Sequence, residues 1–192
     1  LGFSFWFYIN GEVILPVLGA IVTGALLAFL YFNVFSRSQK IFMGDTGSLL
    51  IGFIVAVFAI RFMEYNVDAL APAHRYTMKS APAVALAILI VPVIDTIRVF
   101  FLRLSRGHSP FAADKTHIHH RMLTLGFSHI QIAVVLAVVN VLFILMAYCL
   151  RDFGTIRLLI LVLVLGLAVF HLPSLGIRYR LRKMKRQKNL RR

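Results

Sequence analysis

A single carboxylate between two glycines is the first candidate for chemistry in this chain. Asp45 stands in the run Gly44-Asp45-Thr46-Gly47-Ser48, directly before a long apolar segment. An aspartate at such a position caps a helix and suits the positive end of the helix dipole. The glycines also allow close backbone approach, free N–H groups at a helix start bind phosphate oxygens, and a carboxylate there can hold Mg²⁺. We therefore expect Asp45 to cap a helix and to bind Mg²⁺, with Mn²⁺ as the alternative ion.

A histidine-rich segment further along is the most polar part of the chain. His117, His119 and His120 fall within four residues. Zinc is one interpretation, but no cysteine lies nearby, Asp114 is the only further ligand, and the spacing matches no standard zinc pattern. Histidines can instead donate hydrogen bonds to phosphate, and their charge changes near neutral pH. Basic neighbours favour this second interpretation, an anion-binding surface, and they are Arg106, Lys115 and Arg121.

Asp95 and Arg98 form a third polar feature, within an otherwise apolar run. They are three residues apart and so share one face of a helix. Charges at membrane depth are costly and usually pair or line a polar cavity. A structural ion pair is the simpler interpretation for Asp95, whereas Arg98 could also bind a phosphate group through two parallel hydrogen bonds.

The composition indicates that lipid surrounds most of this chain. Hydrophobic residues make up 60% of the sequence and charged residues only 15%. The apolar residues come in long runs, which means membrane-spanning helices, because the strands of a barrel would alternate. The formal charge of +14 does not indicate nucleic-acid binding, since nine of the 21 basic residues lie in the tail 178–192. A basic run next to a span more often meets anionic membrane lipids.

We predict an all-α, polytopic transmembrane bundle with about five spans. The apolar runs cover residues 14–35, 48–62, 82–102, 130–150 and 155–172. Basic residues gather in the connecting segments 36–46 and 103–129 and in the tail, so the positive-inside rule places these on the cytoplasmic side. We assign residues 1–177 to one membrane-embedded domain. Because the sequence starts within an apolar run, we expect it to be the C-terminal part of a longer protein.

The motifs, in their order, resemble those of a known enzyme family. They are Phe42-Met43-Gly44-Asp45-Thr46-Gly47-Ser48, Asp95-Thr96-Ile97-Arg98, Ser109-Pro110-Phe111, Asp114, His117-Ile118-His119-His120-Arg121-Met122-Leu123 and Gly126-Phe127-Ser128. They are similar to those of the polyprenyl-phosphate N-acetylhexosamine-1-phosphate transferases (glycosyltransferase family 4). The resemblance is greatest to the bacterial undecaprenyl-phosphate N-acetylglucosamine-1-phosphate transferases, and it covers nearly the whole chain except the tail.

This resemblance implies a Mg²⁺-dependent enzyme of the bacterial inner membrane. Such an enzyme transfers a sugar 1-phosphate, by default that of N-acetylglucosamine, from a cytoplasmic UDP-sugar to undecaprenyl phosphate and releases UMP, which initiates a cell-envelope glycan. By motif match, Asp45 is the Mg²⁺-binding aspartate, and His117, His119 and His120 belong to the loop that closes over the donor. Substrate contacts are expected from Arg98, Arg106, Asp114, Lys115 and Arg121. The family's paired acidic motif is absent, so we expect the isolated 192 residues to be inactive.

Two other classes of protein remain open. A polytopic transporter with a basic cytoplasmic tail would account for the spans and for Asp95 and Arg98 within one of them. It would not explain why the polar residues concentrate on loops. A zinc hydrolase using the three histidines would be separated by metal analysis. The sequence leaves the sugar, the polymer and the oligomeric state open, a homodimer included.

Overall fold

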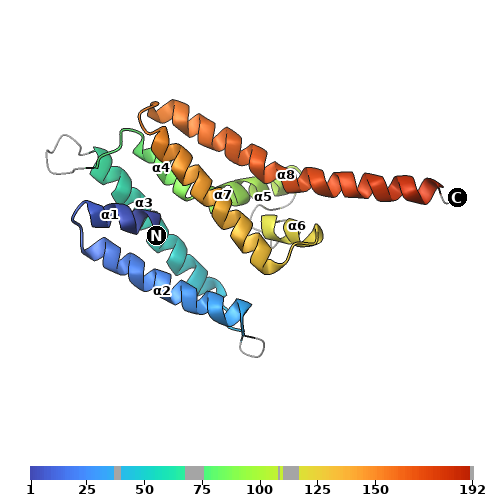
Figure 1. The fold of residues 1–192 in the computed structure, drawn as a ribbon, viewed down its shortest axis with the longest axis horizontal. Helices are drawn as coiled ribbons and strands as arrows, with labels where there is room; N and C mark the ends of the chain where they lie inside the picture. The colour runs from blue at the N-terminus through green and yellow to red at the C-terminus, as the bar shows by residue number, and fades with distance from the viewer. Residues whose placement is uncertain (37–39, 68–75, 108, 110–116, 191–192) are drawn as a thin grey trace.

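The chain folds into helices throughout the part that the structure describes. The computed structural model describes residues 1–36, 40–67, 76–107, 109 and 117–190. In chain order the helices are α1 (Gly2–Ile9), α2 (Ile14–Val34), α3 (Gly44–Val67), α4 (Ala81–Ile88), α5 (Ile90–Leu104), α6 (Ile118–Thr124), α7 (His129–Cys149) and α8 (Thr155–Leu190) (Figure 1). The predicted all-α class is confirmed.

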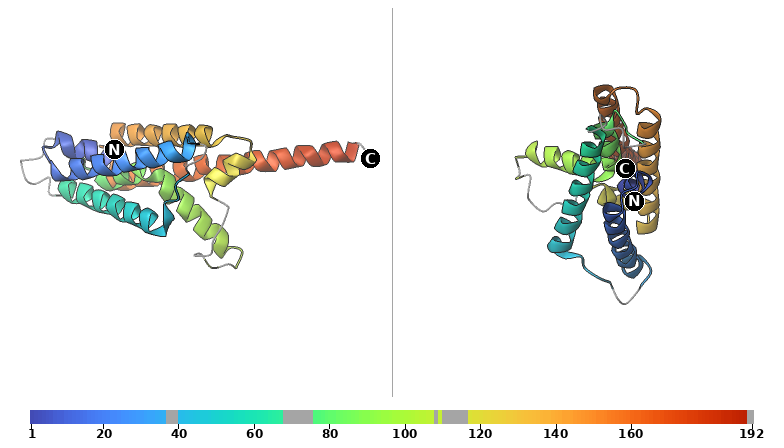
Figure 2. Two further views of the ribbon diagram at one scale, coloured as in Figure 1. Left: turned by 90° about the horizontal axis from the view of Figure 1, so that it is seen from below. Right: turned by 90° about the vertical axis from the view of Figure 1, so that its left-hand side faces the viewer.

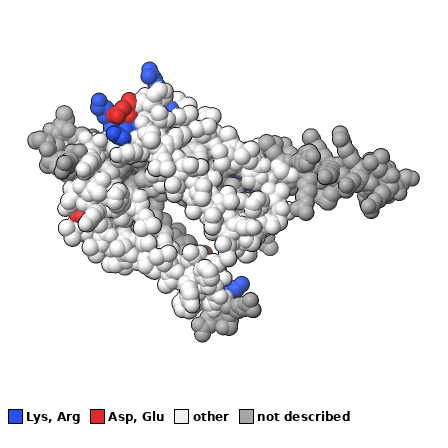
Figure 3. Space-filling view, in the orientation of Figure 1, with Lys and Arg blue, Asp and Glu red and all other residues white. Residues whose placement is uncertain are grey.

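Within the described residues, four helices are long and apolar enough to cross a membrane, and a bent pair makes a fifth candidate. The single helices are α2, α7, the segment Gly44–Asn66 of α3 and the segment Thr155–Ser174 of α8; the bent pair is α4 with α5. Most residues of the single spans are not buried within this chain, which leaves their apolar surface to lipid or to further protein. In Figure 3, most of the coloured charged side chains lie at the upper left of the molecule, and another basic group lies at its lower edge. The number of spans agrees with the predicted five, and α3 is longer than the predicted run 48–62.

The third predicted span, 82–102, is two helices rather than one. α4 and α5 meet at an angle of 78°, and Figure 2 shows α5 leaving the bundle there. Pro92 favours the break because it has no N–H to donate to the carbonyl of Ile88, four residues earlier. The side chain of Asn140 on α7 supplies a donor instead, since its Nδ2 donates to the carbonyls of Ala87 at 3.2 Å and Ile88 at 3.1 Å. A neighbouring helix thus stabilises the bend.

The core centres on α4, which packs against α3, α7 and α8. Small, buried residues allow these backbones to approach closely, and they are Ala81, Ala83, Val84, Ala85 and Ala87. Another part of the core is aromatic, where Trp6 of α1 meets Phe62 of α3 edge-on with ring centroids 4.8 Å apart. These contacts build the bundle from which α5 and α6 extend.

The last span and the basic tail form one helix. α8 runs from Thr155 to Leu190 with Pro173 inside it, and its C-terminal part projects beyond the bundle (Figures 1 and 2). The predicted tail 178–192 therefore prolongs the final span over its described residues.

Candidate active site

The two segments that carry the predicted site meet at one end of the bundle. A cavity of about 660 Å³ lies between the α2–α3 connection and the start of α7. Its lining residues are Asn33, Val34, Ser36 and Lys40 on one side and Ser128, His129 and Ile130 on the other. The described parts of these two segments that line the cavity, at Ser36 and Lys40 and at residues 128–129, thus lie at the same end, as the charge pattern predicted.

Asp45 lies in the first turn of α3, one residue inside the helix rather than at its cap. The helix begins at Gly44, whose φ of +69° suits a glycine. The Ser48 hydroxyl donates to the carbonyls of Gly44 and Asp45, at 3.2 and 2.9 Å. The Asp45 residue itself is exposed, at the positive end of the helix dipole. Mg²⁺ in proteins is usually held by one or two carboxylates together with substrate phosphates, and the accessible carboxylate of Asp45 suits this kind of binding.

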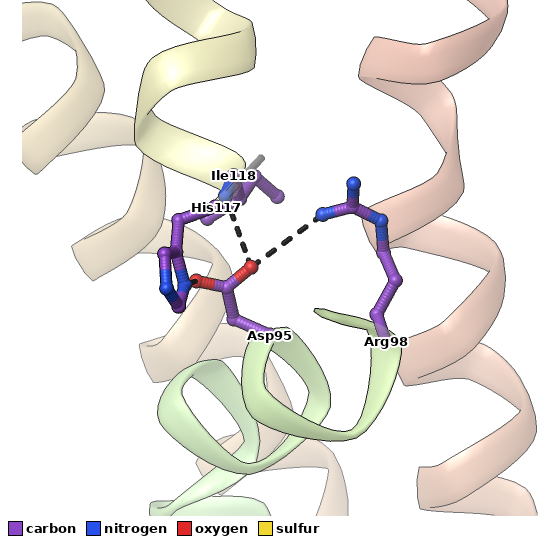
Figure 4. A network of polar contacts seen from close by, with 4 residues as sticks. All are labelled: Asp95, Arg98, His117 and Ile118. Carbon is purple, nitrogen blue, oxygen red and sulfur yellow. Dashed lines mark hydrogen bonds and ion pairs between the residues drawn. The ribbon is translucent and has the colours of Figure 1, made fainter. Parts of the chain in front are cut away.

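Asp95 is the centre of a polar network at the start of α6 (Figure 4). Its Oδ1 accepts a hydrogen bond from the backbone N–H of Ile118 at 2.9 Å and lies 3.5 Å from Nη1 of Arg98. Its Oδ2 lies 3.0 Å from Nδ1 of His117. The predicted Asp95–Arg98 pair is present, but the shorter contacts are those to the histidine segment. The carboxylate is therefore more than an ion-pair partner, because it joins α5 to α6.

The three histidines stand close together without forming a metal site. The His119 and His120 rings are 4.1 Å apart between centroids, and His117 and His119 are nearly parallel at 6.1 Å. Within the described residues, no group of three or more histidine, cysteine or acidic side chains could hold a metal ion. The zinc interpretation therefore has no ligand set in this part of the chain.

His119 favours its neutral form. Partial desolvation lowers the pKa of His119 below its ordinary value of 6.5, and the neighbouring His120 and His117 lower it further, against a smaller opposite effect of Asp95. Although the residue as a whole is exposed, the adjacent His120 ring shields one side of the imidazole from water. His119 can thus serve as a hydrogen-bond partner at neutral pH more readily than as a positive charge.

A second cavity gathers cationic side chains from α5, the turn after it and α6. Its volume is about 440 Å³, and its lining residues are Arg98, Leu102, Arg106, His120, Arg121, Leu123 and Thr124. We call it the cationic cavity. Three guanidinium groups around one small space suit a phosphate, since arginine binds its oxygens through paired, charge-assisted hydrogen bonds. Three of the predicted substrate-binding residues and one of the predicted catalytic histidines therefore converge on one cavity, while Asp114 and Lys115 lie outside the described residues.

Comparison with known proteins gives a consistent picture. Residues 1–63 match the family model described as Glycosyl transferase family 4. Over 133 residues, which are 68% of this chain, the sequence is 32% identical to the undecaprenyl-phosphate alpha-N-acetylglucosaminyl 1-phosphate transferase of Escherichia coli (strain K12), covering 33% of that protein. The chain is related to glycosyl transferase family 4. It is also 37% identical, over 114 residues, to the decaprenyl-phosphate N-acetylglucosaminephosphotransferase of Mycolicibacterium smegmatis, covering 59% of this chain and 28% of that protein.

The similarity to the Escherichia coli protein extends beyond residue 63 and into the site. Because 133 of the 192 residues are aligned with the Escherichia coli protein, any placement of that segment includes positions 70–121. Asp95, Arg98 and the histidine segment lie inside it. The chain spans about a third of the length of the curated relatives it matches. No solved structure matches this chain significantly.

Two parts of this candidate site were not predicted from the sequence. Asn140 supports the bend that carries Asp95 and Arg98, and its signal was a polar amide in the middle of an apolar run. The contact between Asp95 and the backbone of Ile118 had no signal, because it depends on how the chain returns to α5 after 23 residues.

Proposed function

We propose that this chain is part of an enzyme that transfers an N-acetylhexosamine 1-phosphate, first of all N-acetylglucosamine 1-phosphate, from a UDP-sugar to a polyprenyl phosphate. The observation that carries the proposal is the cationic cavity, because it is built from the DTIR and HIHHR motifs on which the family resemblance rests. The relatives are named as polyprenyl-phosphate N-acetylglucosamine-phosphate transferases, which supports both the acceptor and the sugar.

The reaction is a displacement at phosphorus. A phosphate oxygen of the polyprenyl phosphate attacks the β-phosphorus of the UDP-sugar, and the bond from that phosphorus to the bridging oxygen breaks. UMP leaves with the bridging oxygen, and the sugar 1-phosphate joins the lipid phosphate, so the product is a polyprenyl diphosphate linked to the sugar. Negative charge spreads over the phosphoryl oxygens in the transition state, so catalysis depends mainly on positioning and on nearby positive charge.

The residues of the cationic cavity match these requirements. The guanidinium groups of Arg98, Arg106 and Arg121 bind substrate phosphate oxygens and stabilise the charge that develops. His120 lines the same space and the His119 ring lies next to it, so both can hydrogen-bond to a phosphate or a sugar hydroxyl. We place the phosphate groups here because the described residues that line the cavity include three arginines and no acidic side chain to repel a phosphate.

Asp45 completes the proposed site as the ligand for Mg²⁺, or for Mn²⁺ in its place. The bound ion would neutralise donor diphosphate charge and stabilise UMP as the leaving group. Asp45 would hold it by its exposed carboxylate at the start of α3, which lies at the end of the bundle where the α2–α3 connection faces α7. We assign this end to the cytoplasmic face of the bacterial inner membrane, since the UDP-sugar is cytoplasmic and the acceptor is in the lipid.

A transfer assay tests the proposal. Membranes containing the full-length protein are supplied with radiolabelled UDP-N-acetylglucosamine, undecaprenyl phosphate and Mg²⁺, and label is counted in the organic phase. We expect protein-dependent lipid label that is lost in Arg121→Gln and kept in Asp152→Asn. Asp152 is an exposed acid in the turn between α7 and α8, outside the site. Absence of label with every UDP-N-acetylhexosamine would contradict the proposal and return the transporter hypothesis.

A further inference from the structure

One carboxylate holds the histidine segment in place. Asp95 contacts the His117 side chain, the backbone N–H of Ile118 and the Arg98 guanidinium, and only 14% of its side chain is exposed (Figure 4). The contact to Arg98 is the longest of the three, at 3.5 Å, and joins residues of the same helix. The contacts to His117 and Ile118, at 3.0 and 2.9 Å, join α5 to α6.

The contact to Ile118 caps α6 from another helix. The first N–H groups of a helix have no partner within it, and the N-cap residue, His117, makes no side-chain capping bond. Asp95 accepts the bond from the first of these N–H groups. Since α6 is only seven residues long, this bond and its packing against α7 and α8 determine where it lies.

The position of α6 decides the shape of the cationic cavity. His120 and Arg121 of α6 line the cavity together with Arg98 of α5. Asp95 lies three residues before Arg98 and bonds to the beginning of α6. The same carboxylate therefore fixes the distance between the two helices that line the cavity.

The contact to His117 selects one tautomer of its ring. A carboxylate accepts hydrogen bonds and donates none, so Nδ1 of His117 must carry the proton that faces Asp95. In the neutral ring, Nε2 is then left with a free lone pair on the side away from Asp95. The His117 side chain is 37% exposed, so a substrate can reach it.

We propose that Asp95 is a positioning residue that seats α6 against α5 and holds His117 as the Nδ1–H tautomer, with Nε2 presented as an acceptor to the substrate. The effect on turnover rests on the proposed transferase function, whereas the tautomer and the seating of α6 do not. Orienting partners of this kind, one step removed from the substrate, commonly change activity by about 10- to 100-fold when they are replaced.

Two substitutions separate the two roles of Asp95. In Asp95→Asn the amide keeps an oxygen that can accept the bond from Ile118, but its NH₂ group can only donate to Nδ1 of His117. The cap then remains, and His117 is driven to the Nε2–H tautomer. Asp95→Ala removes the cap as well. Asp152→Asn is the matched control, because it makes the same chemical change at an exposed site at the far end of α7.

The experiment combines a spectrum with kinetics on the full-length protein. Histidine labelled with ¹⁵N reports the tautomer at about pH 8.5, where free imidazoles are neutral, and the difference from His117→Gln identifies the His117 signals. We expect the Nδ1–H tautomer in wild type and in Asp152→Asn, and the Nε2–H tautomer in Asp95→Asn. With UDP-N-acetylglucosamine and undecaprenyl phosphate, kcat should fall about 10- to 100-fold in Asp95→Asn with KM nearly unchanged, while Asp95→Ala should also raise KM.

Each readout can overturn the inference by itself. An Nε2–H tautomer in the wild type would contradict the His117 contact, and this measurement needs only the assignment variant His117→Gln beside the wild type. A changed tautomer in Asp95→Asn with undiminished kcat would show that the orientation of His117 has no part in turnover. A wild-type protein without any transfer would overturn the proposed function, and the spectrum would still decide the tautomer.

Discussion

Asn140 should contribute measurably to stability, because it holds the bend between α4 and α5. Its Nδ2 is the donor for two carbonyls, those of Ala87 and Ile88, and Pro92 cannot supply the N–H that the second would receive in a straight helix. Replacing Asn140 by leucine keeps a similar side-chain volume and removes both bonds. The carbonyl of Ile88 then loses the donor that replaced the missing N–H of Pro92, and an unpaired polar group among apolar side chains is costly, whereas the carbonyl of Ala87 still accepts a backbone N–H.

The magnitude follows from the number of bonds lost. Side-chain hydrogen bonds between membrane helices contribute about 0.6 kcal/mol on average and up to about 1.7 kcal/mol. Two such bonds predict a loss of about 1–3 kcal/mol in the free energy of unfolding for Asn140→Leu. Because the bend carries Asp95 and Arg98 to α6, transfer activity should fall in the protein that remains folded.

The assay is SDS-driven unfolding in mixed micelles, followed by circular dichroism. Asn33→Leu is the matched control, since the Asn33 side chain donates only to the carbonyl of Phe29 in its own helix. That bond should matter less, because the carbonyl already receives a bond within the helix. An unchanged free energy of unfolding in Asn140→Leu, or an equal loss in Asn33→Leu, would refute the account of the bend.

Four further outcomes are expected. Asp45→Asn should abolish Mg²⁺-dependent lipid labelling at an unchanged protein level in the membrane, and normal labelling would remove its role as the metal ligand. Arg121→Gln should weaken binding of the UDP-sugar about 10- to 100-fold in a titration, because a bond to a charged group contributes about 1.5–3 kcal/mol, while Arg121→Lys should recover part of it. Because the pKa of His119 is lowered in the folded protein, the unfolded chain binds a proton at this residue more readily as pH falls. The stability that depends on neutral His119 is therefore fully present above pH 6.5 and is lost as pH falls below it. Thermal unfolding at about pH 8 and about pH 5.5 should therefore show a smaller acid destabilisation in His119→Gln than in wild type, and equal losses would contradict this. Ser128→Ala should cost about 1 kcal/mol by removing the capping box that Ser128 forms with Gln131 at the start of α7, as measured by the same SDS unfolding.

The sequence predicted the parts of the fold that depend on local composition. Long apolar runs identified α2, α7 and the membrane part of α8 to within a few residues, because a span must bury its own backbone bonds. The run 82–102 was predicted as one helix since apolar residues continue through it without a gap. Its break depends on Pro92 together with Asn140, which lies on another helix, so no pattern within the run reveals it.

In the candidate site, too, local spacing could be predicted from the sequence, whereas contacts between distant segments could not. The spacing of Asp95 and Arg98 predicted their pair, because residues three apart on a helix face the same way. The link from Asp95 to His117 could not be predicted, because it depends on the path of the chain between α5 and α6. The basic residues of the cationic cavity were predicted from the sequence. That residues of α5 and α6 line the same cavity depends on how the two helices pack, which the sequence did not reveal.

The central claim is phosphosugar transfer, and the fate of the donor's β-phosphorus tests it most directly. Full-length protein in membranes would receive UDP-N-acetylglucosamine labelled with ³²P at the β-position, together with undecaprenyl phosphate and Mg²⁺. Our account predicts that the label enters the lipid fraction together with the sugar and that UMP is released in equal amount. Transfer of the sugar with the label left behind in UDP would contradict it, because the enzyme would then break the sugar–phosphate bond instead of the diphosphate.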